Sequence, residues 1–206
     1  MNVSPLPRIY AITSRELSGL SHREQCVRLI AGGIDLIQIR EKSMNSDELF
    51  HDVGECVALC HKHGVRILIN DRVDIAIASG ADGVHLGQTD MEVREARRLM
   101  GADKIIGVST HNEDELRAAL ETDADYIAIG PVFGTTTKDN PDPTLGIEEF
   151  RRLRQMVSGR PVVAIGGINS TNFRDVLSAG ADSVAVIGAL YSRDESIEAR
   201  IQAFAD

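Results

Sequence analysis

Short apolar runs recur along the chain, and each has the length of a single β-strand. They are rich in Ile, Val, Leu and Ala and occupy residues 8–12, 35–39, 66–69, 83–86, 104–108, 125–129, 161–165 and 182–187. Apolar residues at helical spacing fill several of the intervals, as in HREQCVRLIAG (22–32), DELFHDVGECVALCHKHG (47–64) and EVREARRLMG (92–101). Strands that alternate with helices in this way indicate eight β–α units around a parallel sheet.

A two-unit repeat narrows the choice among parallel folds. The segments GGIDLIQIR, SGADGVHLG, TDADYIAIG and AGADSVAVIG share a turn of small residues, an aspartate and then an apolar strand. A proline or a basic residue precedes the odd-numbered strands, whereas the even-numbered strands follow Asp35, Asp82, Asp125 and Asp182. A two-unit module repeated four times closes naturally into a (β/α)8 TIM barrel. We therefore predict an α/β protein with a single TIM-barrel domain over residues 1–206.

The composition limits what such a domain binds. The chain has 206 residues, of which 43% are hydrophobic and only 4% aromatic, enough for a core of aliphatic side chains. Its formal net charge of −9 argues against a general affinity for nucleic acid or for an anionic membrane. No apolar run approaches the ~20 residues of a membrane span, and the start of the chain lacks the pattern of a signal peptide. The expected location is therefore the cytoplasm, and anion binding would need a local cluster of cations.

The cysteines leave a metal site open as an alternative. Cys56 and Cys60 lie in HDVGECVALCHKH (51–63), a segment that also holds three histidines. Both cysteines, however, fall on the apolar stripe of the helix predicted over 47–64, where small buried thiols are common. A role in packing is favoured over a role in metal binding.

Charged side chains gather where the strands end, and the active site of such barrels forms at that face. Arg40 and Lys42 follow the second strand and Lys138 follows the sixth, so three cations converge in an otherwise acidic protein. Asp71 and Asp90 follow the third and fourth strands and form a carboxylate pair suited to Mg²⁺, which completes its coordination shell with phosphate oxygens. A salt-bridged rim would explain two or three of these residues. All five on one face favour a site for a diphosphate and Mg²⁺.

Glycines at the last two strand ends indicate a second anion site. AIGGI ends the seventh strand and VIGAL ends the eighth, where barrels often bind a phosphate through backbone N–H groups. Two phosphate sites on one face suggest a reaction that joins two phosphorylated small molecules.

The segments that follow successive strands are QIREK, NDR, HLGQTD, GVSTH, GPVFGTTTK and AIGGI. In this order they resemble the thiamin phosphate synthase family, from about Tyr10 to about Leu190. Members of that family are (β/α)8 barrels that join hydroxymethylpyrimidine diphosphate to a thiazole phosphate, giving thiamin phosphate and pyrophosphate. The resemblance therefore implies a transferase of thiamin biosynthesis that uses Mg²⁺.

The resemblance also implies a role for each matching residue. The pyrimidine diphosphate would be held by Gln38, Arg40, Lys42, Asn70, Ser109 and Lys138, and Mg²⁺ by Asp71 and Asp90. Of these, Arg40, Lys42, Ser109 and Lys138 would act in catalysis. The thiazole phosphate would contact Thr135, Thr137, Gly167, Ile187 and Gly188. Two positions depart from the family pattern, because Gly188 stands where a serine is frequent and Gly134 where a proline is frequent.

Two other functions remain open on the sequence. A thiazole tautomerase shares this fold and needs a general acid or base, for which His111 is a candidate. A protein that only binds thiazole phosphate or thiamin phosphate would have no use for the Mg²⁺ carboxylates. The intact set of cations and carboxylates favours the synthase over both.

Barrels of this size are commonly homo-oligomers, so the sequence leaves a homo-oligomer open. The alternation of His85 with apolar neighbours predicts a packing role for that residue.

Overall fold

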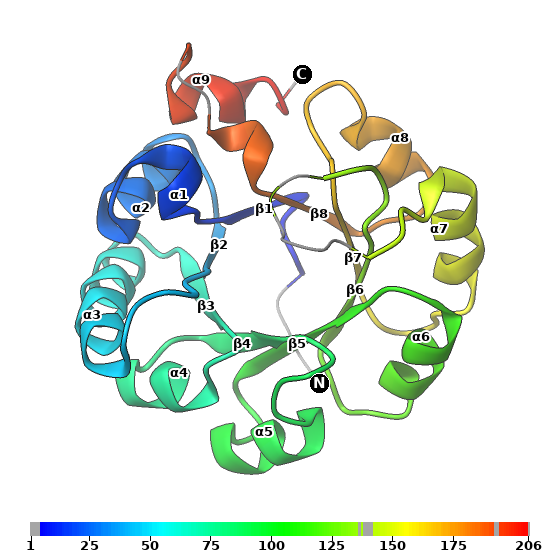
Figure 1. Ribbon diagram of the computed structural model, residues 1–206, viewed down its shortest axis with the longest axis horizontal. Coiled ribbons are helices and arrows are strands. Elements are labelled where there is room, and N and C mark those ends of the chain that lie inside the picture. The colour runs from blue at the N-terminus through cyan, green and yellow to red at the C-terminus, as the bar shows by residue number, and fades with distance from the viewer. Residues whose placement is uncertain (1–4, 136, 138–141, 192–193, 206) are drawn as a thin grey trace.

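Eight parallel strands close into a barrel in the computed structural model, which describes residues 5–135, 137, 142–191 and 194–205 (Figure 1). Each strand pairs with its neighbours in chain order, and the last strand pairs back with the first. The strands are β1 (Ile9–Ile12), β2 (Leu36–Ile39), β3 (Arg66–Asn70), β4 (Gly83–Leu86), β5 (Ile105–Thr110), β6 (Tyr126–Ile129), β7 (Val162–Ile165) and β8 (Ser183–Val186). The predicted (β/α)8 barrel is confirmed, and every predicted strand is present to within two residues at either end.

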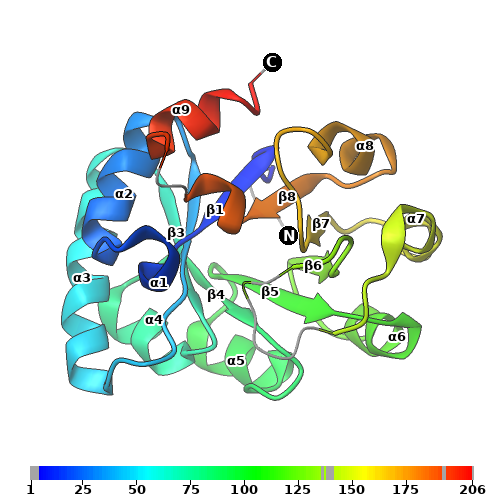
Figure 2. The ribbon, with the colours of Figure 1, turned by 45° about the horizontal axis from the view of Figure 1, so that its top comes forward.

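Helices form an outer ring around the strands (Figures 1 and 2). They are α1 (Arg15–Ser18), α2 (His22–Ala31), α3 (Ser46–Lys62), α4 (Val73–Ser79), α5 (Val93–Met100), α6 (Glu113–Leu120), α7 (Gly146–Gln155), α8 (Phe173–Ser178), the 3-10 helix η1 (Gly188–Leu190) and α9 (Ile197–Gln202). A side-chain cap fixes the start of α2. At α2, Ser21 Oγ accepts the N–H of Glu24 at 3.2 Å and the Glu24 carboxylate accepts the N–H of Ser21 at 2.9 Å, which is a capping box.

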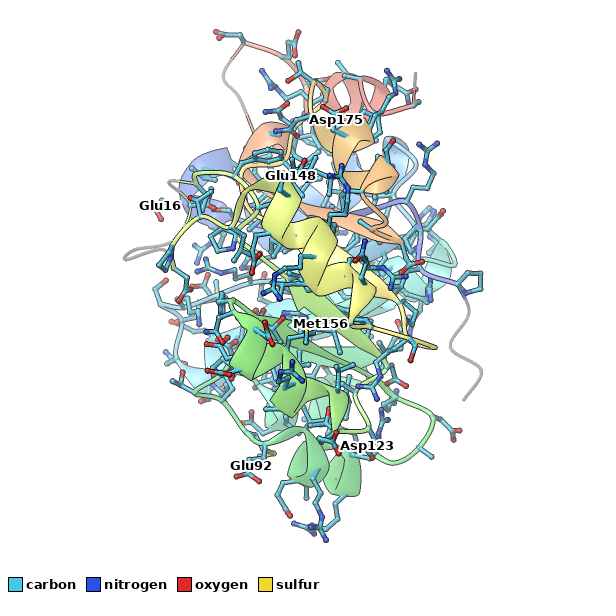
Figure 3. All side chains as sticks on the ribbon, turned by 90° about the vertical axis from the view of Figure 1, so that its right-hand side faces the viewer. Glu16, Glu92, Asp123, Glu148, Met156 and Asp175 are labelled. Carbon is cyan, nitrogen blue, oxygen red and sulfur yellow. The ribbon has the colours of Figure 1, made fainter. Side chains whose placement is uncertain are left out.

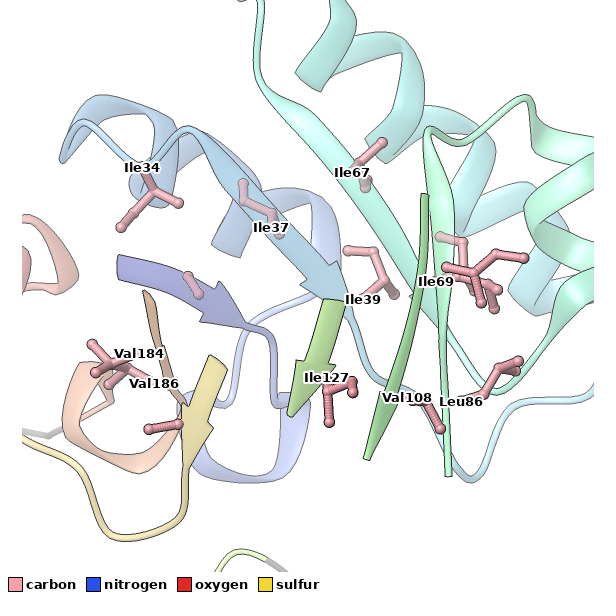
Figure 4. Packing of buried hydrophobic residues seen from close by; sticks show 14 of the residues in the cluster. Ile34, Ile37, Ile39, Ile67, Ile69, Leu86, Val108, Ile127, Val184 and Val186 are labelled. Atoms are coloured by element: carbon pink, nitrogen blue, oxygen red, sulfur yellow. The ribbon is translucent and has the colours of Figure 1, made fainter. Parts of the chain in front are cut away.

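Alternate residues of the strands supply two separate cores. One set points into the barrel and includes Tyr10, Ile12, Leu36, Leu68, Ile105, Tyr126, Ala128, Val163 and Ala185. The other set packs against the helices, and Figure 4 shows Ile37 and Ile39 on β2 beside Ile67 and Ile69 on β3, as the strand register requires. Because successive side chains point to opposite faces of a strand, a strand buried on both faces needs a run that is apolar throughout.

The repeated aspartates join neighbouring strands at the amino-terminal end of the barrel. Each of three carboxylates accepts a backbone N–H near the start of the preceding strand at 2.8 Å, in the pairs Asp82 with Ile67, Asp125 with Ile106, and Asp182 with Val162. A basic side chain contacts each of these carboxylates, namely His61, Arg97 and Arg154 respectively. Asp35, the remaining aspartate of the repeat, is exposed. The sequence repeat therefore corresponds to a repeated contact between strand pairs.

The cysteines are fully buried where α2 packs against α3. Hydrogen bonds with Cys56 and Cys60, together with burial, raise the pKa of the Cys26 thiol. A thiol held in its neutral form packs as a small apolar group, which agrees with the packing role predicted from the helical stripe. Among the residues that the structure describes, no group of three or more His, Cys, Asp or Glu side chains is placed to hold a metal ion.

Charged side chains cover the outer face of α6 and α7, the side of the molecule seen in Figure 3. Glu113 on α6 contacts Arg117 at 2.6 Å and Arg152 of α7 at 2.7 Å, so one carboxylate connects the two helices. Exposed pairs of this kind contribute only about 0–1 kcal/mol each. Within the described ranges, no helix combines the length and the apolar character needed to cross a membrane.

Asp125→Ala is expected to destabilise the barrel by about 2 kcal/mol or more, because it leaves the Ile106 N–H and the Arg97 guanidinium without their carboxylate in a buried position. Denaturant unfolding followed by circular dichroism measures the change. Asp35→Ala is the matched control, since it removes an exposed aspartate of the same repeat and should stay within about 0.5 kcal/mol of the parent chain. Equal losses in the two variants would show that the strand-to-strand contact adds no stability.

Candidate active site

The carboxyl ends of the strands surround a cavity of about 630 Å³. Every predicted site residue in the described part of the chain lines it, namely Gln38, Arg40, Lys42, Asn70, Asp71, Asp90, Ser109, Thr135, Thr137, Gly167, Ile187 and Gly188. Lys138, the remaining predicted residue, lies outside the described residues. The barrel thus gathers residues that are far apart in sequence, and the roles assigned to them remain predictions.

Two carboxyl groups lie against each other at the ends of β3 and β4. Asp71 has a left-handed backbone conformation (φ 63°), which is uncommon for a residue with a side chain, and its N–H donates to the carbonyl of His85 at 2.8 Å. The Asp90 carboxylate accepts the N–H of Gly87 at 2.7 Å. Burial, followed by the hydrogen bond with the Asp71 carboxyl, raises the pKa of Asp90. Two carboxyl groups this close favour either a shared proton or a cation between them.

The ammonium of Lys42 supplies a cation at this position. It contacts the Asp71 carboxylate directly, although the Lys42 side chain is 58% exposed. A positive charge is therefore stabilised beside the carboxylate pair. Mg²⁺ fits the same donors, since it takes few protein carboxylates and keeps water or phosphate oxygens as its other ligands. Arg40, two residues before Lys42, lines the same cavity, and its backbone N–H donates to Thr13 Oγ1 at 3.2 Å.

Threonines and glycines line the cavity beside β6, β7 and β8. The hydroxyl oxygens of Thr135 and Thr137 are 2.8 Å apart. Gly167 has φ 62°, and a Cβ there would lie 2.5 Å from the Gly134 carbonyl oxygen, so a side chain is excluded. A Cβ on Gly188 would lie 3.2 Å from the Thr137 methyl group, so glycine suits the close approach of these two segments. Hydroxyl and backbone N–H donors of this kind are suited to a phosphate.

A chain of hydrogen bonds leads from the barrel interior to the cavity. Gln38 Nε2 contacts the Tyr10 hydroxyl, which lies 3.4 Å from the Tyr126 hydroxyl. The Tyr126 hydroxyl lies 2.7 Å from His85 Nδ1, and His85 Nε2 lies 2.8 Å from Ser109 Oγ. Burial lowers the pKa of His85 to about 4 and raises the pKa of Tyr126 well above its usual value. The side chains of this part of the cavity are therefore uncharged at neutral pH.

These protonation states decide what Ser109 presents to a ligand. A neutral imidazole has one donor and one acceptor nitrogen. When the protonated Tyr126 hydroxyl donates to His85 Nδ1, the proton of the imidazole lies on Nε2 and donates to Ser109 Oγ. The Ser109 hydroxyl proton is then free to be donated to a molecule in the cavity.

The packing role predicted for His85 is incomplete and needs correction. The side chain is buried, but it lines the cavity and contacts Ser109. The sequence also assigned no role to Tyr10 and Tyr126, which form the part of this hydrogen-bond network that lies in the barrel interior. A signal was available in the strand parity, because Tyr10, Gln38, His85 and Ser109 occupy inward-facing positions of their strands. A polar residue at such a position faces the barrel axis rather than the helices.

His111, the candidate acid or base of a tautomerase, also lines the cavity. Its Nδ1 lies 2.8 Å from Glu115 Oε2 and its Nε2 lies 3.3 Å from Asp142 Oδ2. Both ring nitrogens are thus engaged by carboxylates. A general acid or base needs a nitrogen directed at the substrate. This arrangement therefore favours a structural role, in which His111 connects the segments that follow β5 and β6, over a catalytic role.

Comparison with known proteins identifies the family. A family model described as thiamine monophosphate synthase matches residues 9–190. The chain belongs to this family. It is 45% identical over 189 residues to the thiamine-phosphate synthase of Chloroflexus aurantiacus, with 91% of this chain and 87% of that protein covered. It is 46% identical over 188 residues to the thiamine-phosphate synthase of Methanocella arvoryzae, with 91% and 88% covered.

A solved structure agrees with the sequence comparison. The thiamine phosphate pyrophosphorylase of Pyrococcus furiosus is similar to this chain with a TM-score of 0.85 and 33% identity, over 96% of this chain and 93% of that structure. The family expected from the strand-end motifs is therefore confirmed.

His85→Asn is expected to weaken the pH dependence of stability. The folded-state pKa of about 4 lies below the ordinary value of 6.5, so the unfolded chain binds more protons between these values. Stability is therefore complete above the unfolded-state pKa and falls as the pH drops towards the folded-state pKa, by about 2 kcal/mol for this group between roughly pH 7.5 and 5. Denaturant unfolding at both pH values measures the loss, with the exposed His63→Asn as control. A pH dependence that His85→Asn leaves unchanged would contradict a buried neutral imidazole.

Proposed function

We propose that the protein is a transferase that joins hydroxymethylpyrimidine diphosphate to thiazole phosphate, or to its carboxylated form, releasing pyrophosphate and forming thiamin phosphate. The main support for this proposal is that one cavity contains two groups of residues suited to bind anions. Cations and a carboxylate pair follow β2 to β4, and threonine hydroxyls and glycine backbone follow β6 to β8. A reaction between a diphosphate and a monophosphate needs both. Membership of the thiamine monophosphate synthase family supports the same activity.

The chain's own residues bind the diphosphate and leave the pyrimidine ring in neutral surroundings. Arg40 and Lys42 would contact the diphosphate, with Lys138 as a third cation, while the ring lies towards Gln38 and Ser109. Cleavage of the bond between the pyrimidine methylene and the diphosphate oxygen places negative charge on the leaving pyrophosphate. Cations fixed beside that group stabilise this charge more in the transition state than in the ground state.

The complementary positive charge develops on the aminopyrimidine. The lowered pKa keeps His85 uncharged, so the imidazole would not repel the positive charge that develops on the pyrimidine ring. The thiazole nitrogen then attacks the methylene carbon, so no protein nucleophile is needed and the remaining task is positioning. The threonine hydroxyls and the backbone at Gly167 and Gly188 would hold the thiazole phosphate for that attack.

Asp71 and Asp90 would hold Mg²⁺ through their carboxylates. When bound, the ion would neutralise diphosphate oxygens and so assist departure of the pyrophosphate. The contact of Lys42 with Asp71 supports this assignment, because it shows a positive charge accommodated at the pair. Small phosphorylated substrates require neither nucleic acid nor a membrane as a partner. The three unpaired cysteines fit a reducing compartment, which supports the cytoplasm as the location.

A direct assay tests the proposed reaction. Purified protein is mixed with hydroxymethylpyrimidine diphosphate, thiazole phosphate and Mg²⁺, and thiamin phosphate is followed after oxidation to fluorescent thiochrome. Product should form only when both substrates and the metal are present. Full activity in excess EDTA would contradict the metal site.

The thiazole tautomerase is the alternative outcome of the same assay. It would give no thiamin phosphate although the protein still binds thiazole phosphate, and His111→Gln would then abolish isomerisation of the thiazole carboxylate phosphate. The engagement of both His111 nitrogens by carboxylates weighs against this outcome.

Asp71→Asn is expected to lower kcat by about 100-fold or more and to raise the Mg²⁺ concentration needed for half-maximal rate, because it removes one negative ligand without changing the shape of the side chain. Steady-state kinetics across a Mg²⁺ titration measure both effects. Asp47→Asn removes the same charge from an exposed position on α3 and should leave the titration unchanged. An unaltered kcat in folded Asp71→Asn would remove Asp71 from the metal site.

A further inference from the structure

Glu41 lies between the two cations that follow β2, yet its side chain turns away from the cavity. Arg40 and Lys42 line the cavity, whereas Glu41 is absent from its lining. The Glu41 side chain is only 7% exposed. A carboxylate at this point of the sequence would otherwise oppose the binding of an anion by its two neighbours.

Five donors surround the Glu41 carboxylate. Oε1 accepts the backbone N–H of Lys42 at 2.7 Å, the backbone N–H of Ser43 at 2.6 Å and the Ser43 hydroxyl at 2.7 Å. Oε2 lies 3.3 Å from Arg15 Nη1 and 3.3 Å from His22 Nε2. The carboxylate therefore ties its own loop into a tight turn and connects that turn to α1 and α2.

The protonation states of Glu41 and His22 favour a stable contact between them. Burial would raise the pKa of Glu41, but the hydrogen bonds from Ser43, Arg15 and His22 outweigh it and lower that pKa to about 2, so the group is a carboxylate at neutral pH. Burial lowers the pKa of His22, whose side chain is fully buried. The neutral ring then directs its N–H at the carboxylate from Nε2, because Nδ1 has no partner among the described residues.

We propose that Glu41 is a positioning residue, which holds the loop after β2 so that Arg40 and Lys42 face the diphosphate. The proposal rests on the function proposed above. The backbone of Arg40 is fixed at the other end of the same turn, where its N–H donates to Thr13 Oγ1 at 3.2 Å. With both sides of the turn fixed, the two cations need little reorganisation when the anion binds, which preserves affinity.

Glu41→Gln separates positioning from simple charge. It keeps the size of the side chain and removes its charge. If Glu41 acted only through its charge, the loss of a negative group beside two cations would strengthen anion binding. If Glu41 positions the loop, binding should weaken in the variant. An amide has one acceptor oxygen where the carboxylate has two, and the charge-assisted hydrogen bonds with Arg15 and Ser43 are lost. The two accounts thus predict opposite signs.

The test measures binding of inorganic pyrophosphate with Mg²⁺ by isothermal titration calorimetry. We expect Glu41→Gln to bind about tenfold more weakly than the parent chain, which corresponds to the loss of one charge-assisted contact. Glu48→Gln is the matched control, since Glu48 is an exposed glutamate in the first turn of the following helix and its loss should change affinity by less than about twofold. Unchanged or tighter binding by Glu41→Gln would overturn the proposal.

Steady-state kinetics add a readout that a general loss of stability would not give. In Glu41→Gln the KM for the pyrimidine diphosphate should rise about tenfold, while the KM for thiazole phosphate stays within about twofold. An equal rise in both KM values would assign Glu41 to overall stability and overturn the positioning role. Absence of pyrophosphate binding by the parent chain would instead overturn the diphosphate site itself, and the role of Glu41 with it.

Ser43→Ala keeps the test decisive if Glu41→Gln does not fold. This variant leaves the carboxylate in place and removes one of its hydrogen bonds on the exposed side of the turn. We expect pyrophosphate affinity to fall by about threefold, with the KM for thiazole phosphate unchanged. An affinity equal to that of the parent chain would contradict the positioning role.

Discussion

The pairing of β8 with β1 closes the sheet, and the positions of the candidate site residues depend on that closure. All eight strand pairs are parallel, so in the closed sheet the carboxyl ends of the strands meet around a single opening. Residues after β2, β3 and β4 then lie across the opening from residues after β6, β7 and β8. The repeated aspartates at the opposite end connect neighbouring strands, so the barrel separates the residues that stabilise it from the residues that line the cavity.

Opposite charges concentrate at this opening in a chain whose net charge is −9. The contact between Lys42 and Asp71 balances one carboxylate of the pair, and burial, followed by the hydrogen bond with Asp71, raises the pKa of Asp90. Mg²⁺ held by Asp71 and Asp90, as proposed, would neutralise the two carboxylates, and the Lys42 ammonium would then be available to a diphosphate. The neutral hydrogen-bond chain that includes His85 provides a contrasting region with no net charge. Charged and neutral regions of one cavity thus suit the two halves of the pyrimidine substrate.

The strands and the gathering of residues around the cavity could be predicted because both depend on the order of residues along the chain. Apolar runs mark strands that are buried on two faces, and a residue that follows such a strand must lie at the opening of the barrel. His85 and Glu41 escaped this reasoning because their roles depend on the direction of the side chain. His85 looked like part of an apolar strand but faces the barrel axis. The sequence assigns no role to Glu41, because its contacts with Arg15 and His22 depend on a side chain that turns away from the cavity.

A crystal structure with Mn²⁺ in place of Mg²⁺ and with inorganic pyrophosphate would locate the proposed metal and diphosphate sites, because the anomalous scattering of manganese identifies the position of the ion. We expect an ion bound by the carboxylates of Asp71 and Asp90, with pyrophosphate oxygens completing its shell and Arg40 and Lys42 turned to the anion. Manganese at another place, or an ion at the pair with pyrophosphate bound elsewhere, would contradict the assignment of this opening as a metal-assisted diphosphate site.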